Sequence, residues 1–188
     1  MKDGAFIQKM LQKGADAREK TKTAFDHLSL TQLDWKPAEE SWSIGQCLDH
    51  LIVSDCSYFP AFKKNMEGKF KMSFWEKSSP FSSLFGKILT SQVQEFSKKK
   101  LKTPAVFYPS EDHIDAVILE RFYKHLDTLL EYIASFTEVD VDKIHITSPA
   151  LKFVTYSLRK AIILLLQHEH RHINQALAVI QLKEFPPQ

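Results

Sequence analysis

The sequence predicts an all-α fold: a four-helix bundle with an additional short helix between the second and third long helices. Long segments repeat apolar residues at intervals of three and four, which is the period of an amphipathic α-helix. The chain has only five glycines, so few tight turns are expected, and we find no strand pattern. Four amphipathic helices bury their apolar faces by packing against one another, which favours a bundle.

The first long helix is predicted from about Ala5 to Leu28, where apolar residues recur among lysines. Gly14 weakens the centre of this helix slightly. Trp35 lies in the connection that follows, and Trp42 comes directly after that connection. Because indole rings are costly to leave in water, we expect both tryptophans to plug the end of the bundle.

A second helix is predicted to begin at Ser43-Ile44-Gly45-Gln46, which matches a capping box. It runs to about Met66, with a kink at Pro60. At 100° per residue, one side of this helix carries mainly apolar residues: Leu48, Leu51, Ile52, Asp55 and Phe59. Small and polar residues share the sector of His50: Gln46, Cys47, Ser54 and Ser57. This sector is either a solvent-facing stripe, which periodicity slightly favours, or the lining of a polar cavity.

The segment between the second and third long helices has a mixed pattern. After Glu67 we expect a loop with exposed or lidding aromatic residues, followed by a shorter helix from Pro80 to Ser97. The basic run from Lys98 to Lys102 is short enough to be a solvated linker, and binding of an anion or a nucleic acid is the less favoured alternative. Thr103 to Ser110 contains two prolines and is predicted to be extended.

Ser110, Glu111 and Asp112 are predicted to open the third long helix. Its core stripe contains Ile114, Ile118, Phe122, Leu126, Leu129 and Ile133. His113 and His125 are explained as surface positions on this helix. The final helix is predicted to start near Thr155.

The run from Leu164 to Ile180 on the final helix holds three of the eight histidines. His168 and His172 are four residues apart, so on a helix they project from one face about 6 Å apart along the axis. Two imidazoles at this spacing can bind one divalent metal, although a half-buried histidine is more often satisfied by a carbonyl group than by a metal. A catalytic metal site usually has three protein ligands. His50 is the natural third ligand because it lies well inside another long helix beside a polar stripe.

Composition limits the other function classes. With 188 residues, 44% of them hydrophobic, the chain fits a single domain spanning residues 1–188. The net charge of +2 does not indicate nucleic-acid binding. No stretch approaches the roughly 20 apolar residues of a membrane span, and the N-terminus lacks the features of a signal peptide, so we expect a cytoplasmic protein. Cys47 and Cys56 are too far apart on one helix for a disulfide, which agrees with a reducing compartment.

Three motifs resemble the DinB/YfiT-like family of metal-binding helical bundles, the DNA-damage-inducible family rather than the polymerase of that name. The motifs are Trp42-Ser43-Ile44, Leu48-Asp49-His50-Leu51, and His168-Glu169-His170-Arg171-His172 with Gln175. The resemblance covers nearly the whole chain, including the lead-in from Leu30 to Pro37. It implies a divalent metal, commonly zinc or nickel, on His50, His168 and His172.

The resemblance also implies a class of reaction. Characterised members of the family include thiol S-transferases that use bacillithiol, mycothiol or glutathione, and mycothiol-dependent maleylpyruvate isomerases. We therefore expect a metal-dependent thiol S-transferase that joins a low-molecular-weight thiol to a small electrophile. A metal-dependent hydrolase and a non-enzymatic, stress-related protein with a structural metal are the alternatives.

The roles of the neighbouring residues stay open. Gln175 lies one turn past His172 and either orients a ligand or the bound thiol, or forms an interhelical hydrogen bond. Asp49 and Glu169 point about 100° away from the neighbouring ligands, so they either support the ligands or lie on the surface. Cys47 is interpreted as a small packing residue and, less well, as an alternative ligand.

The final helix has a second apolar stripe, formed by Ile163, Leu166, Ile173 and Leu177 on the side opposite the histidine pair. A helix that is apolar on both sides must bury both of them. Either the segment from Glu67 to Pro109 covers this stripe, or a second subunit does. We favour a homodimer, because members of the family that the chain resembles are often dimeric.

Overall fold

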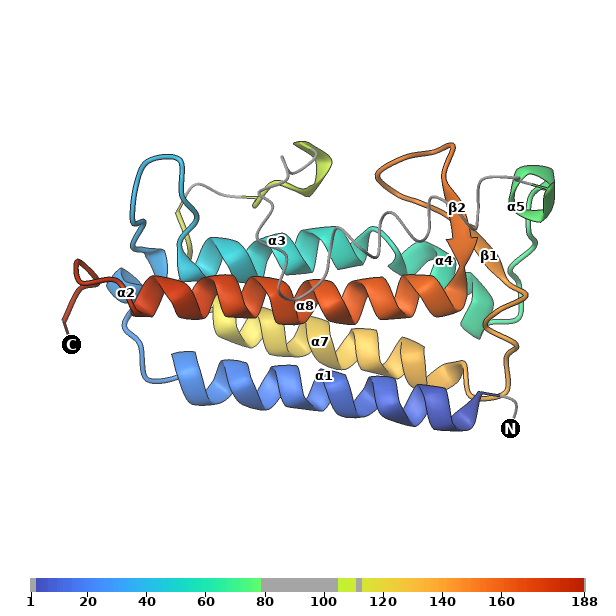
Figure 1. Cartoon of the computed structure of the whole chain (residues 1–188), viewed down its shortest axis with the longest axis horizontal. Helices are drawn as coiled ribbons and strands as arrows, with labels where there is room; N and C mark the ends of the chain where they lie inside the picture. The colour runs from blue at the N-terminus through green and yellow to red at the C-terminus, as the bar shows by residue number, and fades with distance from the viewer. Residues whose placement is uncertain (1–2, 79–104, 111–112, 188) are drawn as a thin grey trace.

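Four long helices form the body of the protein in a computed structural model that describes residues 3–78, 105–110 and 113–187 (Figure 1). They are α1 (Gly4–Phe25), α3 (Ile44–Cys56), α7 (Ile118–Ser135) and α8 (Leu158–Ile180). Both α1 and α3 pack against α7 and α8, so the four helices enclose one core. The all-α bundle predicted from the sequence is confirmed.

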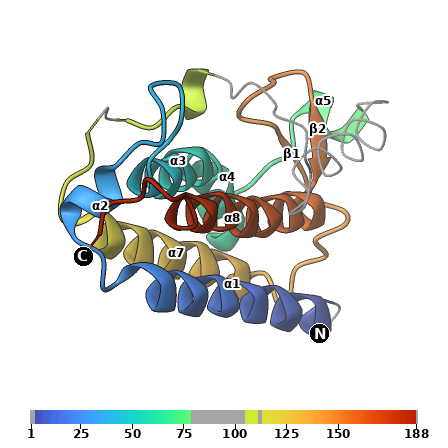
Figure 2. The same ribbon diagram turned by 60° about the vertical axis from the view of Figure 1, so that its left-hand side comes forward.

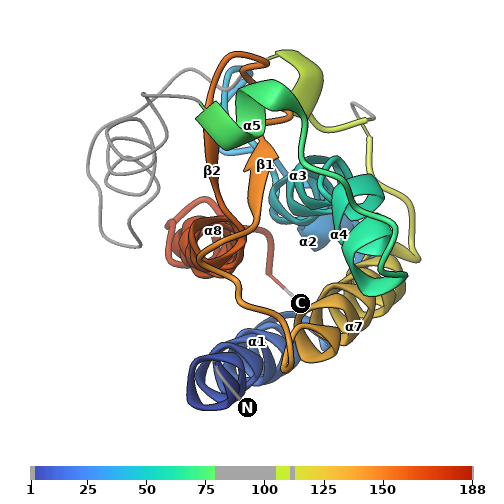
Figure 3. The same cartoon turned by 90° about the vertical axis from the view of Figure 1, so that its right-hand side faces the viewer.

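The directions of the helices follow from their order. Helices α1 and α8 run one way along the bundle, and α3 and α7 run the other way (Figures 1 and 2). Parallel neighbours such as α3 and α7 require a connection that returns along the bundle, and this accounts for the long segment between them. Seen end-on, α3 and α8 form one side of a four-sided bundle and α1 and α7 form the opposite side (Figure 3).

Shorter elements lie at the ends of the bundle and along one of its sides (Figure 1). They are α2 (Leu30–Asp34), α4 (Phe59–Met66), α5 (Phe74–Ser78), the 3-10 helix η1 (Ala105–Phe107), β1 (His145–Thr147) and β2 (Thr155–Ser157). Next to α2, Trp35 packs edge-on against Phe185, with ring centroids 5.7 Å apart. Trp35 therefore plugs the end of the bundle, as predicted, whereas Trp42 lies against the histidines described below.

The second predicted helix is interrupted. It ends at Cys56, and a new helix, α4, begins at Phe59. Pro60 lies in the first turn of α4. Backbone N–H groups in the first turn have no partner within the helix, so a proline there costs no hydrogen bond. The predicted kink at Pro60 is thus a break between two helices.

The third long helix begins later than predicted, at Ile118 rather than at Ser110 to Asp112. The backbone N–H and the hydroxyl of Ser110 donate to Asp49, at 2.6 and 2.7 Å, so Ser110 does not cap a helix. The backbone N–H of Ile114 donates to Asp34 at 2.9 Å. These long-range hydrogen bonds hold Ser110 and Ile114 outside the helix.

Strands β1 and β2 were not expected from the sequence. They form a short antiparallel pair in which Ile146 lies opposite Tyr156. The hydroxyl of Tyr156 is 2.7 Å from that of Tyr58, and both rings are buried, so this pair fixes the hairpin to the end of the bundle. The hydroxyl of Ser157 accepts from the backbone of Lys160, which caps α8 and explains why this helix begins at Leu158 rather than near Thr155.

Two predictions fall outside the described residues: the helix from Pro80 to Ser97 and the basic run from Lys98 to Lys102. Both cysteines are free, in agreement with the prediction that they form no disulfide. Among the described helices, none combines the length and apolar character needed to cross a membrane.

The second apolar stripe of α8 is buried in part within the chain, and Ile163 and Leu177 stay half-buried. Leu166 and Ile173 are buried, and the stripe faces α1, where His170 Nε2 lies 3.0 Å from the backbone carbonyl oxygen of Lys13. Neither the segment from Glu67 to Pro109 nor a second subunit is needed to cover these two residues. The homodimer stays a prediction, and this stripe does not support it.

Gly45 offers a test of how tightly α3 packs. A Cβ atom at Gly45 would lie 2.5 Å from Cγ2 and 2.9 Å from Cβ of Ile114. We expect Gly45→Ala to lower the free energy of unfolding by roughly 1–3 kcal/mol because the first turn of α3 becomes overpacked. Urea unfolding followed by circular dichroism measures this change.

Gly14→Ala is the matched control. The three atoms nearest to its Cβ would all belong to the side chain of Leu130, with Cδ2 the nearest. The half-buried Leu130 can rotate away, and alanine has the higher helix propensity, so we expect a smaller loss. Equal losses for the two variants, or a more stable Gly45→Ala protein, would contradict the packing described here.

Candidate metal centre

Helix α3 is fixed at its start by the predicted capping box. The hydroxyl of Ser43 accepts from the backbone of Gln46 at 3.1 Å, and the side chain of Gln46 accepts from the backbone of Ser43 at 3.2 Å. This cap sets where α3 begins, and His50 then lies two turns into the helix on the side that faces α8. The start of α3 is therefore correctly predicted by the residues at that position.

The structure brings together the three histidines predicted as metal ligands. His50 comes from α3, and His168 and His172 come from α8. The distances between ring centroids are 4.5 to 4.9 Å. Nε2 of His50 is 3.1 Å from Nε2 of His168, and one nitrogen from each ring lies within 4.8 Å of the others. Imidazole nitrogens at these separations can bind a single divalent metal.

The tautomer of His50 follows from its backbone partner. Nδ1 of His50 is 2.5 Å from the carbonyl oxygen of Phe107 in η1. A carbonyl oxygen only accepts, so Nδ1 carries the proton and the neutral ring directs the Nε2 lone pair toward His168. Metal-binding histidines characteristically donate their second ring N–H in this way. The donor set therefore fits a divalent metal.

Asp49 holds the segment that supplies this carbonyl group. Its buried carboxylate accepts from Ser110, as described above, and from Nη2 of Arg121 at 2.9 Å. Ser110 is three residues beyond Phe107, so these contacts keep the Phe107 carbonyl over His50. Of the two positions predicted for Asp49, the structure shows the supporting one rather than the surface one.

Burial controls the charge of two of the imidazoles. Burial, and after it the nearby His168, lower the pKa of His50 to about 4. The pKa of His172 is well below its ordinary value, chiefly through burial and then through His168 and His50. Both rings are neutral near pH 7, which is the state that a metal requires.

The three rings differ in their contact with solvent. His50 and His172 are 2% and 8% exposed, whereas the side chain of His168 is 17% exposed. Nδ1 of His168 lies 3.4 Å from the hydroxyl of Ser54. On another side, Trp42 packs on His50 and His172, with ring centroids 4.7 and 5.8 Å apart. The cluster is therefore closed by an indole on one side and reaches solvent at His168.

The sector around His50 is buried. Gln46, Cys47 and Ser54 are all shielded from solvent, so the solvent-facing interpretation of this stripe is wrong. Burial raises the pKa of the Cys47 thiol to about 12. Cys47 is thus a packing residue, and its thiol is protonated at neutral pH.

Gln175 lies at the edge of the cluster. Its side chain is exposed, one turn beyond His172 on α8. It interacts with His172 and partly opposes the lowering of that pKa. This position next to the imidazoles leaves Gln175 accessible to a bound molecule.

The sequence analysis missed a second group of polar residues. Asp55, His125 and Glu169 are buried together in the core. The predicted surface position of His125 is wrong, as is the surface alternative for Glu169. The signal was present in the helical phase: His125 falls three residues after Phe122 and four before Leu129, which are both core residues.

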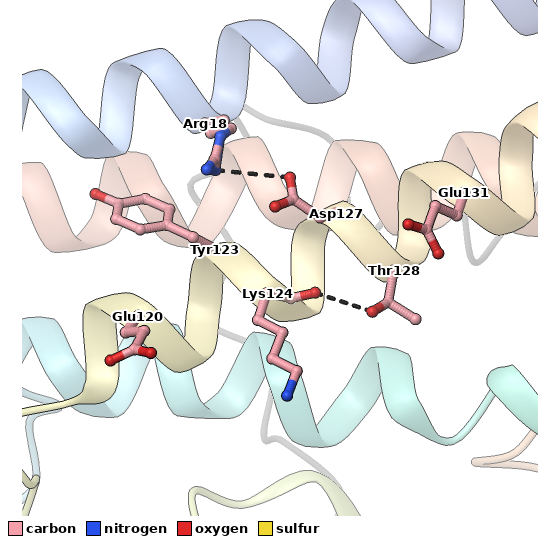
Figure 4. A pocket seen from close by; sticks show the side chains of 7 residues that line it. All are labelled: Arg18, Glu120, Tyr123, Lys124, Asp127, Thr128 and Glu131. Atoms are coloured by element: carbon pink, nitrogen blue, oxygen red, sulfur yellow. Dashed lines mark hydrogen bonds and ion pairs between the residues drawn. The ribbon is translucent and has the colours of Figure 1, made fainter.

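A surface hollow between α1 and α7 is lined mainly by charged side chains (Figure 4). The lining residues are Arg18, Glu120, Tyr123, Lys124, Asp127, Thr128 and Glu131. Arg18 and Asp127 form an ion pair at 3.6 Å, and the guanidinium of Arg18 lies over the ring of Tyr123. These contacts pair the side chains with one another, and the hollow includes none of the three histidines.

Comparison with known proteins identifies the family of this chain. A sequence model of the DinB superfamily matches residues 15–176 of this chain. The uncharacterized protein YuaE of Bacillus subtilis (strain 168) is 29% identical over 164 residues, which are 85% of this chain and 90% of that protein. No solved structure matches the chain. Because the family match spans most of the chain, this chain belongs to the DinB superfamily.

Proposed function

We propose that the protein is a metal-dependent thiol S-transferase that joins a low-molecular-weight thiol to a small electrophile. A divalent metal, zinc or nickel, would be held by His50, His168 and His172. The observation that carries this proposal is the convergence of three imidazoles with an accessible edge at His168. Catalytic metal sites keep a coordination position open, whereas structural sites are closed. When bound, the metal would lower the pKa of a coordinated thiol, which supplies a thiolate near neutral pH.

The residues around the histidines prepare the site for this chemistry. The carbonyl group of Phe107 fixes the His50 tautomer, and Asp49 holds the segment that carries this carbonyl. Trp42 covers His50 and His172 with an apolar ring and excludes water from that side. A less hydrated thiolate is the stronger nucleophile, so this cover favours sulfur attack over competing reactions with water.

The reacting thiol comes from a second molecule. Cys47 is buried and protonated, and Cys56 lies next to His125, 3.8 Å from Nδ1, rather than in the histidine cluster. In the proposed reaction the thiolate sulfur attacks an electrophilic carbon, a C–S bond forms, and the leaving group departs with the bonding electron pair and takes up a proton. Gln175, exposed beside His172, is placed to orient the incoming thiol or the electrophile.

A structural metal is the second candidate. His50 and His172 are almost fully buried and come from two different helices, so a metal between them would also tie α3 to α8. For a purely structural metal, binding free energy is folding free energy, and chelation unfolds the bundle. For a catalytic metal, chelation removes activity before it removes the fold.

Metal binding tests the ligand set. We expect His50→Ala and His172→Ala to weaken zinc binding at this centre by more than the roughly 10–100-fold that loss of an outer partner costs, because each variant removes a direct ligand. Equilibrium competition with a chromophoric chelator, on protein purified without a metal-binding tag, measures this affinity.

His170→Gln is the matched control for metal binding. His170 lies between the two ligands on α8, but its ring contacts the backbone of Lys13 on α1 instead. Glutamine can still donate to that carbonyl, so the variant should bind zinc as the wild type does. If the wild type, His50→Ala, His172→Ala and His170→Gln all bind zinc with equal affinity, the three-histidine centre is wrong.

The pH dependence of stability tests the burial of His50. Its folded pKa of about 4 is below the ordinary value of 6.5, so between these values the unfolded chain binds more protons than the folded chain. The metal-free protein should therefore lose stability as the pH falls from 6.5 toward 4. His50→Gln removes this contribution, and its free energy of unfolding should vary less over that range.

Urea unfolding in the presence of a chelator gives these free energies. His113→Gln is the control, because the His113 side chain is 91% exposed, and it should keep the wild-type pH dependence. If the His50→Gln and wild-type profiles coincide, His50 is not buried as a neutral ring.

Activity tests the reaction class. Zinc- or nickel-loaded protein should conjugate at least one of glutathione, bacillithiol or mycothiol to a panel of small electrophiles, and His172→Ala should abolish the conjugation. Product formation is followed by mass spectrometry, and the helical signal is followed in parallel by circular dichroism.

Three other outcomes distinguish the alternatives. Hydrolysis of the panel without conjugation would favour the hydrolase. Loss of the helical signal on chelation, with no conjugation by the loaded protein, would favour the structural metal. Conjugation that persists in His172→Ala would place the reaction elsewhere on the protein.

A further inference from the structure

Three buried side chains from three different helices meet in the core beside the histidine centre. Asp55 lies on α3, His125 on α7 and Glu169 on α8. Their side chains are 0%, 3% and 0% exposed, and one potential ligand atom from each lies within 4.8 Å of the others. The histidine centre does not use these residues as ligands.

The contacts in this group are ion pairs, and their distances are too long for hydrogen bonds. Nε2 of His125 is 3.6 Å from Oδ2 of Asp55 and 3.6 Å from Oε1 of Glu169. Among the described residues, Asp55 Oδ2, His125 Nε2 and both Glu169 carboxylate oxygens have no hydrogen-bond partner. Buried polar atoms are almost always partnered, and leaving a charged one unpartnered costs more than about 1–3 kcal/mol. Four such atoms in one place indicate that a ligand belongs among them.

The spacing and number of these atoms match a metal ion. Zinc binds nitrogen and oxygen at about 2.0–2.2 Å, and tetrahedral geometry then separates neighbouring donors by roughly 3.4 Å. The observed separations of 3.6 Å are close to this value. One unpartnered atom from each of the three residues supplies a coordination position, and the second oxygen of Glu169 can approach the same ion as a longer contact that closes the site.

The charges and the orientation of His125 also suit a divalent cation. Two carboxylates neutralise a divalent ion, so the filled site would place no net charge in this part of the core. Nδ1 of His125 lies 3.8 Å from the Cys56 sulfur, a weak acceptor, so the Nε2 lone pair is free for the ion. Phe59 stacks on the ring at 5.4 Å and keeps it in this orientation.

We propose that Asp55, His125 and Glu169 bind a second divalent metal ion, such as zinc, in a closed structural site that joins α3, α7 and α8. The site has no exposed edge, so it is not a place for substrate. Oδ1 of Asp55 lies 3.9 Å from Nδ1 of His168, so an ion on Oδ2 would anchor the carboxylate next to that ligand. The second ion thus supports the histidine centre while being chemically separate from it.

Anomalous diffraction from the wild-type protein tests the proposal directly. Crystals of the untagged full chain grown with zinc should show, above the zinc edge, one peak among the three histidines and a second peak among Asp55, His125 and Glu169. A peak at the histidines alone would overturn the proposal. This measurement needs no variant and does not depend on enzymatic activity.

Zinc stoichiometry of two variants separates the sites. His50→Ala combined with His172→Ala should keep one of two equivalents of zinc, held by the second site. Glu169→Gln has the same shape as the wild type but lacks the anionic ligand, so it should lose the other equivalent and keep the histidine-bound one. Glu131→Gln, at an exposed position on α7, is the control and should bind both.

The proposal of a second site is wrong if the His50/His172 double variant binds no zinc or if Glu169→Gln still binds both equivalents. Should Glu169→Gln fail to fold, the wild-type diffraction result decides. An absence of thiol conjugation by the wild type would count against the proposed function alone and would leave both peaks in place.

Discussion

The need to satisfy polar groups buried between α3 and α8 governs this structure. Burying a polar group in an apolar core without a hydrogen bond costs roughly 2–7 kcal/mol, and burying an unpaired charge costs more. His50, His168 and His172 meet this need through one another, through the Phe107 carbonyl group and, in our proposal, through a metal. Elements outside the bundle, such as η1 and the segment at Ser110, are therefore held close to α3 because they complete these contacts.

Features encoded by neighbouring residues could be predicted from the sequence. The capping box at Ser43, the four amphipathic helices and the His168–His172 pair each depend on a spacing of a few residues, and the structure contains all of them. The start of α7 could not be predicted, because Ser110 and Ile114 donate to carboxylates far away in the chain. The pairing of β1 with β2 likewise depends on a contact between strands that are too short to show a pattern.

The position of His125 shows a different limit of periodicity. Helical phase places His125 on the side of Phe122 and Leu129, but a histidine on that side was interpreted as a surface residue because polar groups usually are exposed. Only the structure shows that Asp55 and Glu169 lie opposite it and provide the charges that make burial possible. Each of the three helices carries one polar residue on its buried side, and the periodicity of one helix does not show that these residues face one another.

Helix α8 shows how one segment can serve several partners. Successive residues of an α-helix point about 100° apart, so neighbours in sequence face different parts of a four-sided bundle. His168 faces α3, Glu169 faces the interior and meets His125 of α7, and His170 faces α1. A shift of α8 by one residue would exchange these partners and leave a carboxylate facing His50, so the phase of this helix is fixed by its polar residues as much as by its apolar stripe. The site and the fold consequently rest on the same contacts, because the side chains that would hold the metals are also the ones that set how α8 packs.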